Sequence, residues 1–220
     1  MKSIPGIIAI FIIVMVVISC SGNVERKNFI ADSDLESGNI SLEYNQALVA
    51  FASGDVTALS ENSWVPVEVG DCLTESQTIR VGAKSFVELQ LADRAGVRIE
   101  ENSEVMIARL SLKPDEAQVR LQVETGAVLC KVSLFSGGES FKVRTRTAIC
   151  GVRGTEFGVT VTSSNETALS VRTGKVAVLP ASVDTEELKE QAPEGDTEVM
   201  AILDEFDKNA TVVEADQEIV

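Results

Sequence analysis

Residues 149–159, ICGVRGTEFGV, place Arg153 between two glycines, inside a run that otherwise has the pattern of a buried strand. A guanidinium beside glycine backbone is one way to hold an anion. Nucleotide-binding loops, however, need GxGxxG, or a glycine loop that ends in Gly-Lys-Ser/Thr before a helix, and a β-type run follows here. We therefore predict a structural role, with Gly151 and Gly154 permitting a tight bend. The five donors of Arg153 would then tie carbonyls, or the carboxylate of Glu156, across that bend.

The side chains that common catalytic sites need are largely missing. The chain has no histidine, which excludes Ser-His and Cys-His pairs and imidazole metal ligands. Acids are numerous, but no pair stands out as hydrolytic, and only Trp64 and Tyr44 offer the larger rings that stack on sugars. Cys72, Cys130 and Cys150 lack CxxC spacing, and each fits a small buried position in a strand, although one disulfide among them remains open. We predict neither an enzyme nor a metal or cofactor site.

One basic stripe is a candidate binding face. Lys142, Arg144 and Arg146 alternate along a predicted strand and therefore share one face of it. The stripe would meet an acidic partner or an anionic glycan, or it would be a solvated face whose charges pair with glutamates on the next strand. Both interpretations remain open at this point.

The N-terminus predicts export and a lipid anchor. Ile7 to Ile18 is an apolar run of twelve residues, which fits a signal-peptide core and is shorter than the ~20 residues of a spanning helix. The run ends in Ser19-Cys20, and a small residue before a cysteine there resembles a bacterial lipobox. We predict that residues 1–19 are a signal peptide and that Cys20 carries acyl chains such as palmitate. The alternative is an uncleaved signal anchor. In either case the protein would face the periplasm or the cell surface.

The charge is negative and uneven. Without residues 1–19 the net charge is 18 − 34 = −16, because Lys2 leaves with the signal. Residues 184–220 hold thirteen acids and two lysines, a net of −11, so the remainder carries only about −5. Nucleic acids and anionic lipid surfaces bind clustered Lys and Arg, so this balance argues against both as partners.

The pattern after the N-terminus predicts one all-β body. Residues 20–46 are polar and fit a flexible tether. Residues 47–180 consist of short alternating runs with turn signals, such as Gly70-Asp71, Ala95-Gly96 and Gly137-Gly138. Residues 181–220 form an acidic tail in which 197–209 fits an amphipathic helix. We expect its apolar residues Val199, Leu203 and Phe206 to pack on the body, which would bring tail carboxylates near the basic stripe.

The body repeats a strand-bend-strand unit. Three stretches align on Gly54, Gly126 and Gly174, each with a hydroxyl residue just before the glycine and a valine two places after it. Glycine permits the bend because it lacks a Cβ. The spacings of 72 and 48 residues are unequal, so this is no regular array. We expect either a twisted β-solenoid-like body or a sandwich-like one.

With these residues in view, the body resembles the FecR family of bacterial envelope domains over about residues 47–180. The resemblance assigns family-signature structural roles to Gly70, Asp71, Gly126, Val152, Arg153, Gly154, Thr155, Phe157 and Gly174. It implies an all-β periplasmic domain. Its founding members relay a signal from an outer-membrane transporter to a cytoplasmic sigma factor, which requires a cytoplasmic segment before the membrane. Only six residues precede the apolar run here, so we do not expect the anti-sigma role.

These observations together predict a non-enzymatic envelope lipoprotein whose FecR-like β domain acts as a protein-interaction or scaffold module, with an envelope protein as its partner. The alternative is an extracytoplasmic sensor that holds a small ligand or a wall glycan. A filled core with a flat charged face would favour the interaction module. A well-formed apolar pocket with convergent polar groups would favour the sensor.

Overall fold

A computed structural model describes residues 44–133, 135, 139–185, 188 and 208–219, and these form an all-β structure of sixteen strands. Its ladders fall into two sheets. Sheet A has the order β4(Cys72–Thr74), β1(Gln46–Ser53), β6(Phe86–Leu91), β7(Ala95–Ile99), β9(Gln118–Val132), β12(Glu156–Val161), β13(Thr167–Thr173), β16(Gln217–Ile219). Sheet B has the order β3(Ser63–Pro66), β2(Val56–Ser60), β5(Thr78–Val81), β8(Ser103–Ser111), β9, β10(Ser140–Arg144), β11(Ala148–Val152), β14(Lys175–Pro180), β15(Thr211–Glu214). The expected all-β fold is confirmed.

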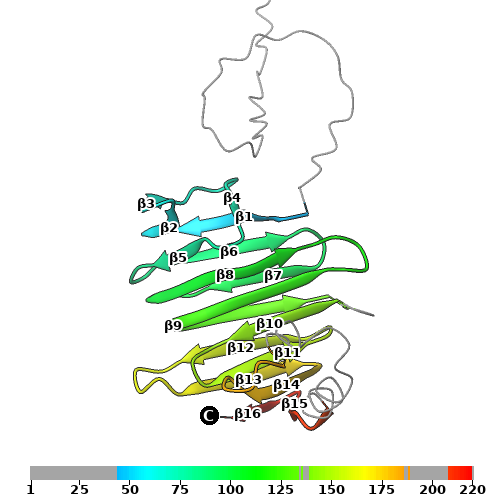
Figure 1. Ribbon diagram of the computed structural model, residues 1–220. Coiled ribbons are helices and arrows are strands. Elements are labelled where there is room, and N and C mark those ends of the chain that lie inside the picture. The colour runs from blue at the N-terminus through cyan, green and yellow to red at the C-terminus, as the bar shows by residue number, and fades with distance from the viewer. Residues whose placement is uncertain (1–43, 134, 136–138, 186–187, 189–207, 220) are drawn as a thin grey trace, which may run out of the picture. The chain divides into compact units, whose positions relative to one another are not determined.

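The long strand β9 belongs to both sheets. Its first half pairs with β8 and β10 in sheet B, and its second half pairs with β7 and β12 in sheet A. β9 and β10 are parallel, whereas β10 and β11 are antiparallel, so the assembly is mixed. Figure 1 shows the strands following one another from β1–β5 at one end of the body to β13–β16 at the other.

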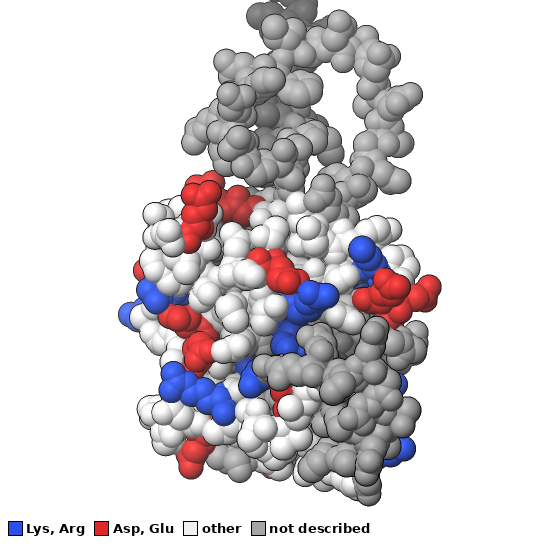
Figure 2. All heavy atoms as spheres, viewed as in Figure 1, with Lys and Arg blue, Asp and Glu red and all other residues white. Residues whose placement is uncertain are grey.

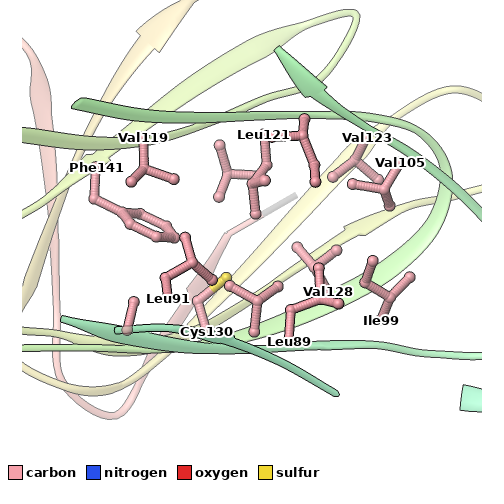
Figure 3. Packing of buried hydrophobic residues seen from close by; sticks show 14 of the residues in the cluster. Leu89, Leu91, Ile99, Val105, Val119, Leu121, Val123, Val128, Cys130 and Phe141 are labelled. Carbon is pink, nitrogen blue, oxygen red and sulfur yellow. The ribbon is translucent and has the colours of Figure 1, made fainter. Parts of the chain in front are cut away.

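The core lies between the two sheets. Figure 3 shows side chains of sheet B (Val105, Val119, Leu121, Val123 and Phe141) pointing toward side chains of sheet A (Leu89, Leu91, Ile99, Val128 and Cys130). These residues occupy alternate positions, as in β6, where every second residue is buried. The period-2 pattern in the sequence therefore turns one side of each sheet inward and leaves the other to solvent.

The chain changes sheets at the bends predicted by the repeat. Gly54 lies between β1 and β2, Gly126 lies within β9, and Gly174 lies between β13 and β14. Their φ angles are 81°, 83° and 85°, a region that L side chains rarely adopt. At each of these glycines the backbone leaves one sheet and enters the other.

A buried hydroxyl group packs against each of these glycines. A Cβ built on Gly54 would lie 2.2 Å from Ser85 Oγ, and a Cβ built on Gly126 would lie 2.1 Å from Ser103 Oγ. At Gly174 it would lie 2.7 Å from the Gly154 carbonyl oxygen and 2.9 Å from Thr155 Oγ1. The hydroxyl groups also bond to the residue that follows the bend, which fixes the two crossing chains together. Asp55 N–H donates to Ser85 Oγ (2.8 Å), Ala127 N–H donates to Ser103 Oγ (2.9 Å), and Thr155 Oγ1 donates to the Lys175 carbonyl (3.0 Å).

The end of the acidic tail adds one strand to each sheet. β15 extends sheet B by pairing with β14, and β16 extends sheet A by pairing with β13. The sequence pattern gave no indication of these strands. The helix predicted over 197–209 lies, apart from its last two residues, outside the described residues, as do residues 1–43 with the predicted signal and Cys20.

One predicted turn is wrong. Ala95-Gly96 begins strand β7, and the turn before it lies at Ala92–Arg94 instead. Ala92 has a φ of 47°, and Arg94 N–H donates to the Leu91 carbonyl, which closes the turn three residues earlier than the glycine suggested. Among the described residues, no helix has the length and apolar character required to cross a membrane.

Candidate functional site

The opening motif forms a corner between β11 and β12. Val152 ends β11, and Phe157 lies near the start of β12, where both point into the core. The Phe157 ring contacts Phe141 edge to face, with centroids 6.4 Å apart. Gly154 has a φ of 73°, which turns the chain so that Thr155 reaches the bend at Gly174. Gly151 does not take part in the bend, contrary to expectation, because it lies within β11, paired with Lys142 and Ala177, and has no positive φ. The motif is thus a backbone device that holds two sheet crossings together.

Arg153 does not tie this corner to Glu156, and that expectation is wrong. Glu156 Oε1 instead accepts from Arg172 at 2.9 Å, because Arg172 lies on the neighbouring strand β13. Arg153 is exposed and lies beside a shallow groove of about 700 Å³ on sheet B, which it lines together with Lys142 and Lys175.

Gly70 and Asp71 close a turn that docks on β1. Gly70 has a φ of 94°, and its N–H donates to the Val49 carbonyl at 2.8 Å. The Val49 N–H in return donates to the Asp71 carbonyl at 2.8 Å. The Asp71 carboxylate accepts from the Glu68 N–H at 2.8 Å, within the turn itself. The pair therefore holds β4 against β1.

The basic stripe is paired with acids. Lys142 and Arg144 share the outer face of β10, but the strand ends at Arg144, so Arg146 lies in the following turn rather than on the strand. Arg144 contacts the carboxylate of Asp184, the first acid of the tail. Arg146 contacts Glu124 at 3.4 Å. Arg146 thus pairs with a glutamate of the neighbouring strand β9, as the second interpretation expected, whereas the partner of Arg144 is an aspartate of the tail.

Asp184 is buried and also lies 3.8 Å from Arg120, which neighbours Lys142 across the β9–β10 ladder. One tail carboxylate therefore lies between two guanidinium groups. Charge-assisted pairs of this kind fix orientation well, so the chain segment that leaves β14 is anchored on sheet B.

Two cysteines are unsuited to chemistry. Cys130 and Cys150 are free thiols buried in the core, as the sequence pattern indicated, whereas Cys72 on β4 is only partly buried and is disulfide-bonded, so the buried position expected for it is wrong. Burial raises the pKa of Cys150 to about 12, and burial together with the nearby Cys150 thiol raises the pKa of Cys130 further. Both thiols are therefore protonated at neutral pH, whereas a nucleophilic or metal-binding cysteine requires the thiolate.

The outer face of sheet A carries a groove of about 480 Å³. Leu129 lies in it with 47% of its surface exposed, although β9 has a partner strand on each side in sheet A. Its neighbours across the ladders are Arg98 on β7 and Gly158 on β12. A Cβ built on Gly96 meets no heavy atom within 4 Å, so the floor beside Leu129 is open.

Ion pairs flank the groove on both sides. On the β6–β7 side, Arg98 contacts Glu88 at 2.9 Å and Glu100 at 2.7 Å. On the β12–β13 side, Arg172 contacts Glu156. Figure 2 shows one face of the body, on which acidic and basic side chains are interspersed. Leu129 and Lys131, the exposed residues of β9 in the groove, thus lie between ion pairs on both sides.

Sequence reasoning missed Ser85, Ser103, Leu129 and Arg120. The two serines carry a recoverable signal, because Ser85-Phe86-Val87, Ser103-Glu104-Val105 and Thr155-Glu156-Phe157 all place a hydroxyl residue two positions before a buried apolar one. The residues before the three hydroxyls also share positive φ, at 55°, 57° and 73°. For Leu129, only its place on the outward side of the β9 alternation marks it as exposed.

Comparison with known proteins supports part of these assignments. Residues 77–177 match the family model described as "FecR protein". Two crystal structures of a "putative anti-sigma factor" from Parabacteroides distasonis ATCC 8503 are similar to the chain, with identities of 23% and 22% and a TM-score of 0.44 each. The alignments cover 64% of this chain and 53% of the other, so the chain spans about half the length of that protein. No curated protein matches the chain.

The matched range runs from just before β5 into β14 and contains the sheet crossings at Gly126 and Gly174. Gly70 and Asp71 precede it, whereas the other signature residues lie within it. The match to the FecR family thus covers residues 77–177, from β5 into β14.

Proposed function

We propose that the protein is a non-enzymatic cell-envelope lipoprotein whose β domain binds another protein through the outer face of sheet A. The anchor would be the acylated Cys20, which places the domain at a bacterial membrane facing the periplasm or the cell surface. The stacked strand-bend-strand units would give the domain a twisted, solenoid-like sandwich form, which suits a rigid module with large exposed sheet faces.

The observation that carries the proposal is the position of Leu129. It is nearly half exposed in the centre of a sheet whose other face packs into a filled core, and ion pairs flank it. An apolar centre with a charged margin is the usual composition of a protein interface. The groove is an open strip on a sheet face, whereas small-ligand sites are concave and enclose most of the ligand.

Site-specific photocrosslinking in intact envelopes tests this function. A benzophenone side chain at Lys131, which is exposed in the groove, should yield discrete protein adducts. The same side chain at Arg109, which is 56% exposed on sheet B, is the matched control and should yield none. Absence of adducts at Lys131, together with a rise in melting temperature on adding wall glycan fragments, would favour the sensor alternative instead.

Replacing Cys20 with Ala tests the anchor. Lipid modification requires the thiol, so the variant should lose its acyl chains, each buried methylene of which contributes about 0.8 kcal/mol to membrane binding. We expect the protein to move from the membrane fraction to the soluble fraction of lysed cells, which immunoblotting measures. Retention of the variant in the membrane with residues 1–19 still attached would instead establish an uncleaved signal anchor.

A further inference from the structure

The groove on sheet A has the arrangement of a self-complementary surface. Its central strand is β9, and the strands on either side, β7 and β12, pair with β9 at the same levels. Arg98 and Gly158 both lie opposite Leu129, and Gly96 and Glu156 both lie opposite Lys131. A charged residue on one side of β9 thus corresponds to a glycine on the other.

We propose that this groove is the interface of a homodimer, with a twofold axis parallel to β9 and passing over Leu129. The proposal rests on the interaction function above and names a second copy of this chain as the partner. Such an axis places β12 of the copy over β7 and β7 of the copy over β12. An isologous contact of this kind requires one surface to complement itself, and the exchange of charged residues with glycines meets that requirement.

The apolar contact follows from the lean of Leu129. A Cβ built on Gly158 would lie 2.9 Å from Leu129 Cδ2, so this side chain leans from β9 toward β12. Because of the twofold axis, the Leu129 side chain of the copy leans toward β7 of the first chain, where Gly96 leaves open space. Arg98 leaves that space free because its guanidinium lies over the Phe86 ring, 3.8 Å from the centroid, on the side of β6. Each Leu129 would therefore enter a hollow of the other copy.

The charges also match across this axis. Glu156 of the copy would lie over Gly96, which is two residues from Arg98 on the same face of β7. Arg172 of the copy would lie on the side of β6, near Glu88. The two ion pairs that each chain makes alone, Arg98–Glu88 and Arg172–Glu156, are thereby joined into one network of alternating sign.

Lys131 would face its own copy, which by itself is unfavourable. However, Lys131 lies directly opposite Glu156 in the β9–β12 ladder. The two lysines and the two glutamates of the dimer therefore sum to zero charge within one cluster. Interspersed opposite charges at the margin of an interface fix its register without requiring burial of a single sign.

A cysteine on the twofold axis tests the dimer directly. Leu129→Cys in the full-length protein, in its native membranes, should form a disulfide to its copy under mild oxidation and give a covalent dimer on a non-reducing gel. Val212→Cys, which replaces a residue 53% exposed on sheet B, is the matched control and should remain monomeric, as should the parent protein. Maleimide labelling of both new cysteines would confirm that both are accessible.

A charge exchange tests the arrangement. Arg98→Glu in the Leu129→Cys background should reduce the covalent dimer about tenfold, since each dimer gains two like-charge contacts worth about 1.4 kcal/mol in sum. Adding Glu156→Arg should restore the dimer, because each new glutamate then faces a new arginine. A purely structural role of Arg98 would predict no such rescue.

Three outcomes would overturn the homodimer. Accessible Leu129→Cys without a covalent dimer refutes it outright. Adducts of Lys131 to a different protein, with no dimer, refute the second copy as partner and leave the interaction function intact. Absence of both dimer and adducts refutes the interaction function as well, so the two failures are distinguishable.

Discussion

Gly126→Val should lower the free energy of unfolding by about 2–6 kcal/mol, the largest effect that we expect from a single substitution. Gly126 has a φ of 83°, in which a β-branched residue costs about 1–3 kcal/mol. A Cβ there would also lie 2.6 Å from the Ser103 Cα, so the backbone of the crossing chain must move, which costs a further 1–3 kcal/mol or so. Denaturant unfolding followed by circular dichroism measures the loss.

Gly151→Ala is the matched control for this prediction. Gly151 lies in β11 without positive φ, and the nearest atom to a Cβ built on it is 3.9 Å away. Its substitution should change the free energy of unfolding by less than about 0.5 kcal/mol. Equal stability of Gly126→Val and the parent protein would show that the chain does not need glycine at its sheet crossings.

Arg94→Met should destabilise the protein by about 3 kcal/mol. Arg94 contacts Glu139 through two nitrogens, at 2.9 Å and 3.1 Å, and Glu139 has only 2% of its side chain exposed. Removing one partner of a buried ion pair leaves a charge in a poorly solvated place, at a cost of about 3–5 kcal/mol. We expect the lower end of this range because 23% of the Arg94 side chain remains exposed. Thermal and denaturant unfolding of the variant measure the change.

Arg146→Met provides the comparison. The Arg146–Glu124 pair is 60% and 31% exposed, and exposed pairs contribute about 0–1 kcal/mol. Its loss should therefore be close to the error of the measurement. Equal stability of the two arginine variants would contradict this prediction, because it would show that burial of Glu139 does not increase the contribution of the Arg94 pair to stability.

The strands of the body could be predicted from the sequence because successive side chains of a strand point to opposite faces of the sheet, so apolar residues recur at every second position when one face is buried. Residues 86–91 alternate apolar with polar, and β6 occupies that range with every second residue buried. The bends at Gly126 and Gly174 were predictable for a similar reason, since a hydroxyl-glycine pair in three aligned units indicates a shared backbone requirement.

The pairing of residues distant in the chain could not be predicted in this way. Arg153 and Glu156 are close in sequence and suggested an ion pair, but the β12–β13 register brings Arg172 to Glu156 instead. The groove could not be predicted for the same reason. It is lined by Leu129, Gly96 and Gly158, which lie on three different strands, and these strands are neighbours only because of the order of sheet A. Strands β15 and β16 are short and pair with β14 and β13, so no local pattern marks them.

The two C-terminal strands impose an order on biogenesis. β13 and β14 are the last strands of the FecR region, and each presents an open edge until β16 and β15 pair with it. Open edges of this kind recruit strands from other molecules. A ribosome delivers residues 211–219 after β13 and β14, so a nascent chain that stalls after Pro180 exposes both edges at once. Chains that lack residues 211–219 should therefore aggregate far more readily than chains that contain them, because β15, β16 and the turn between them cover both edges within the molecule.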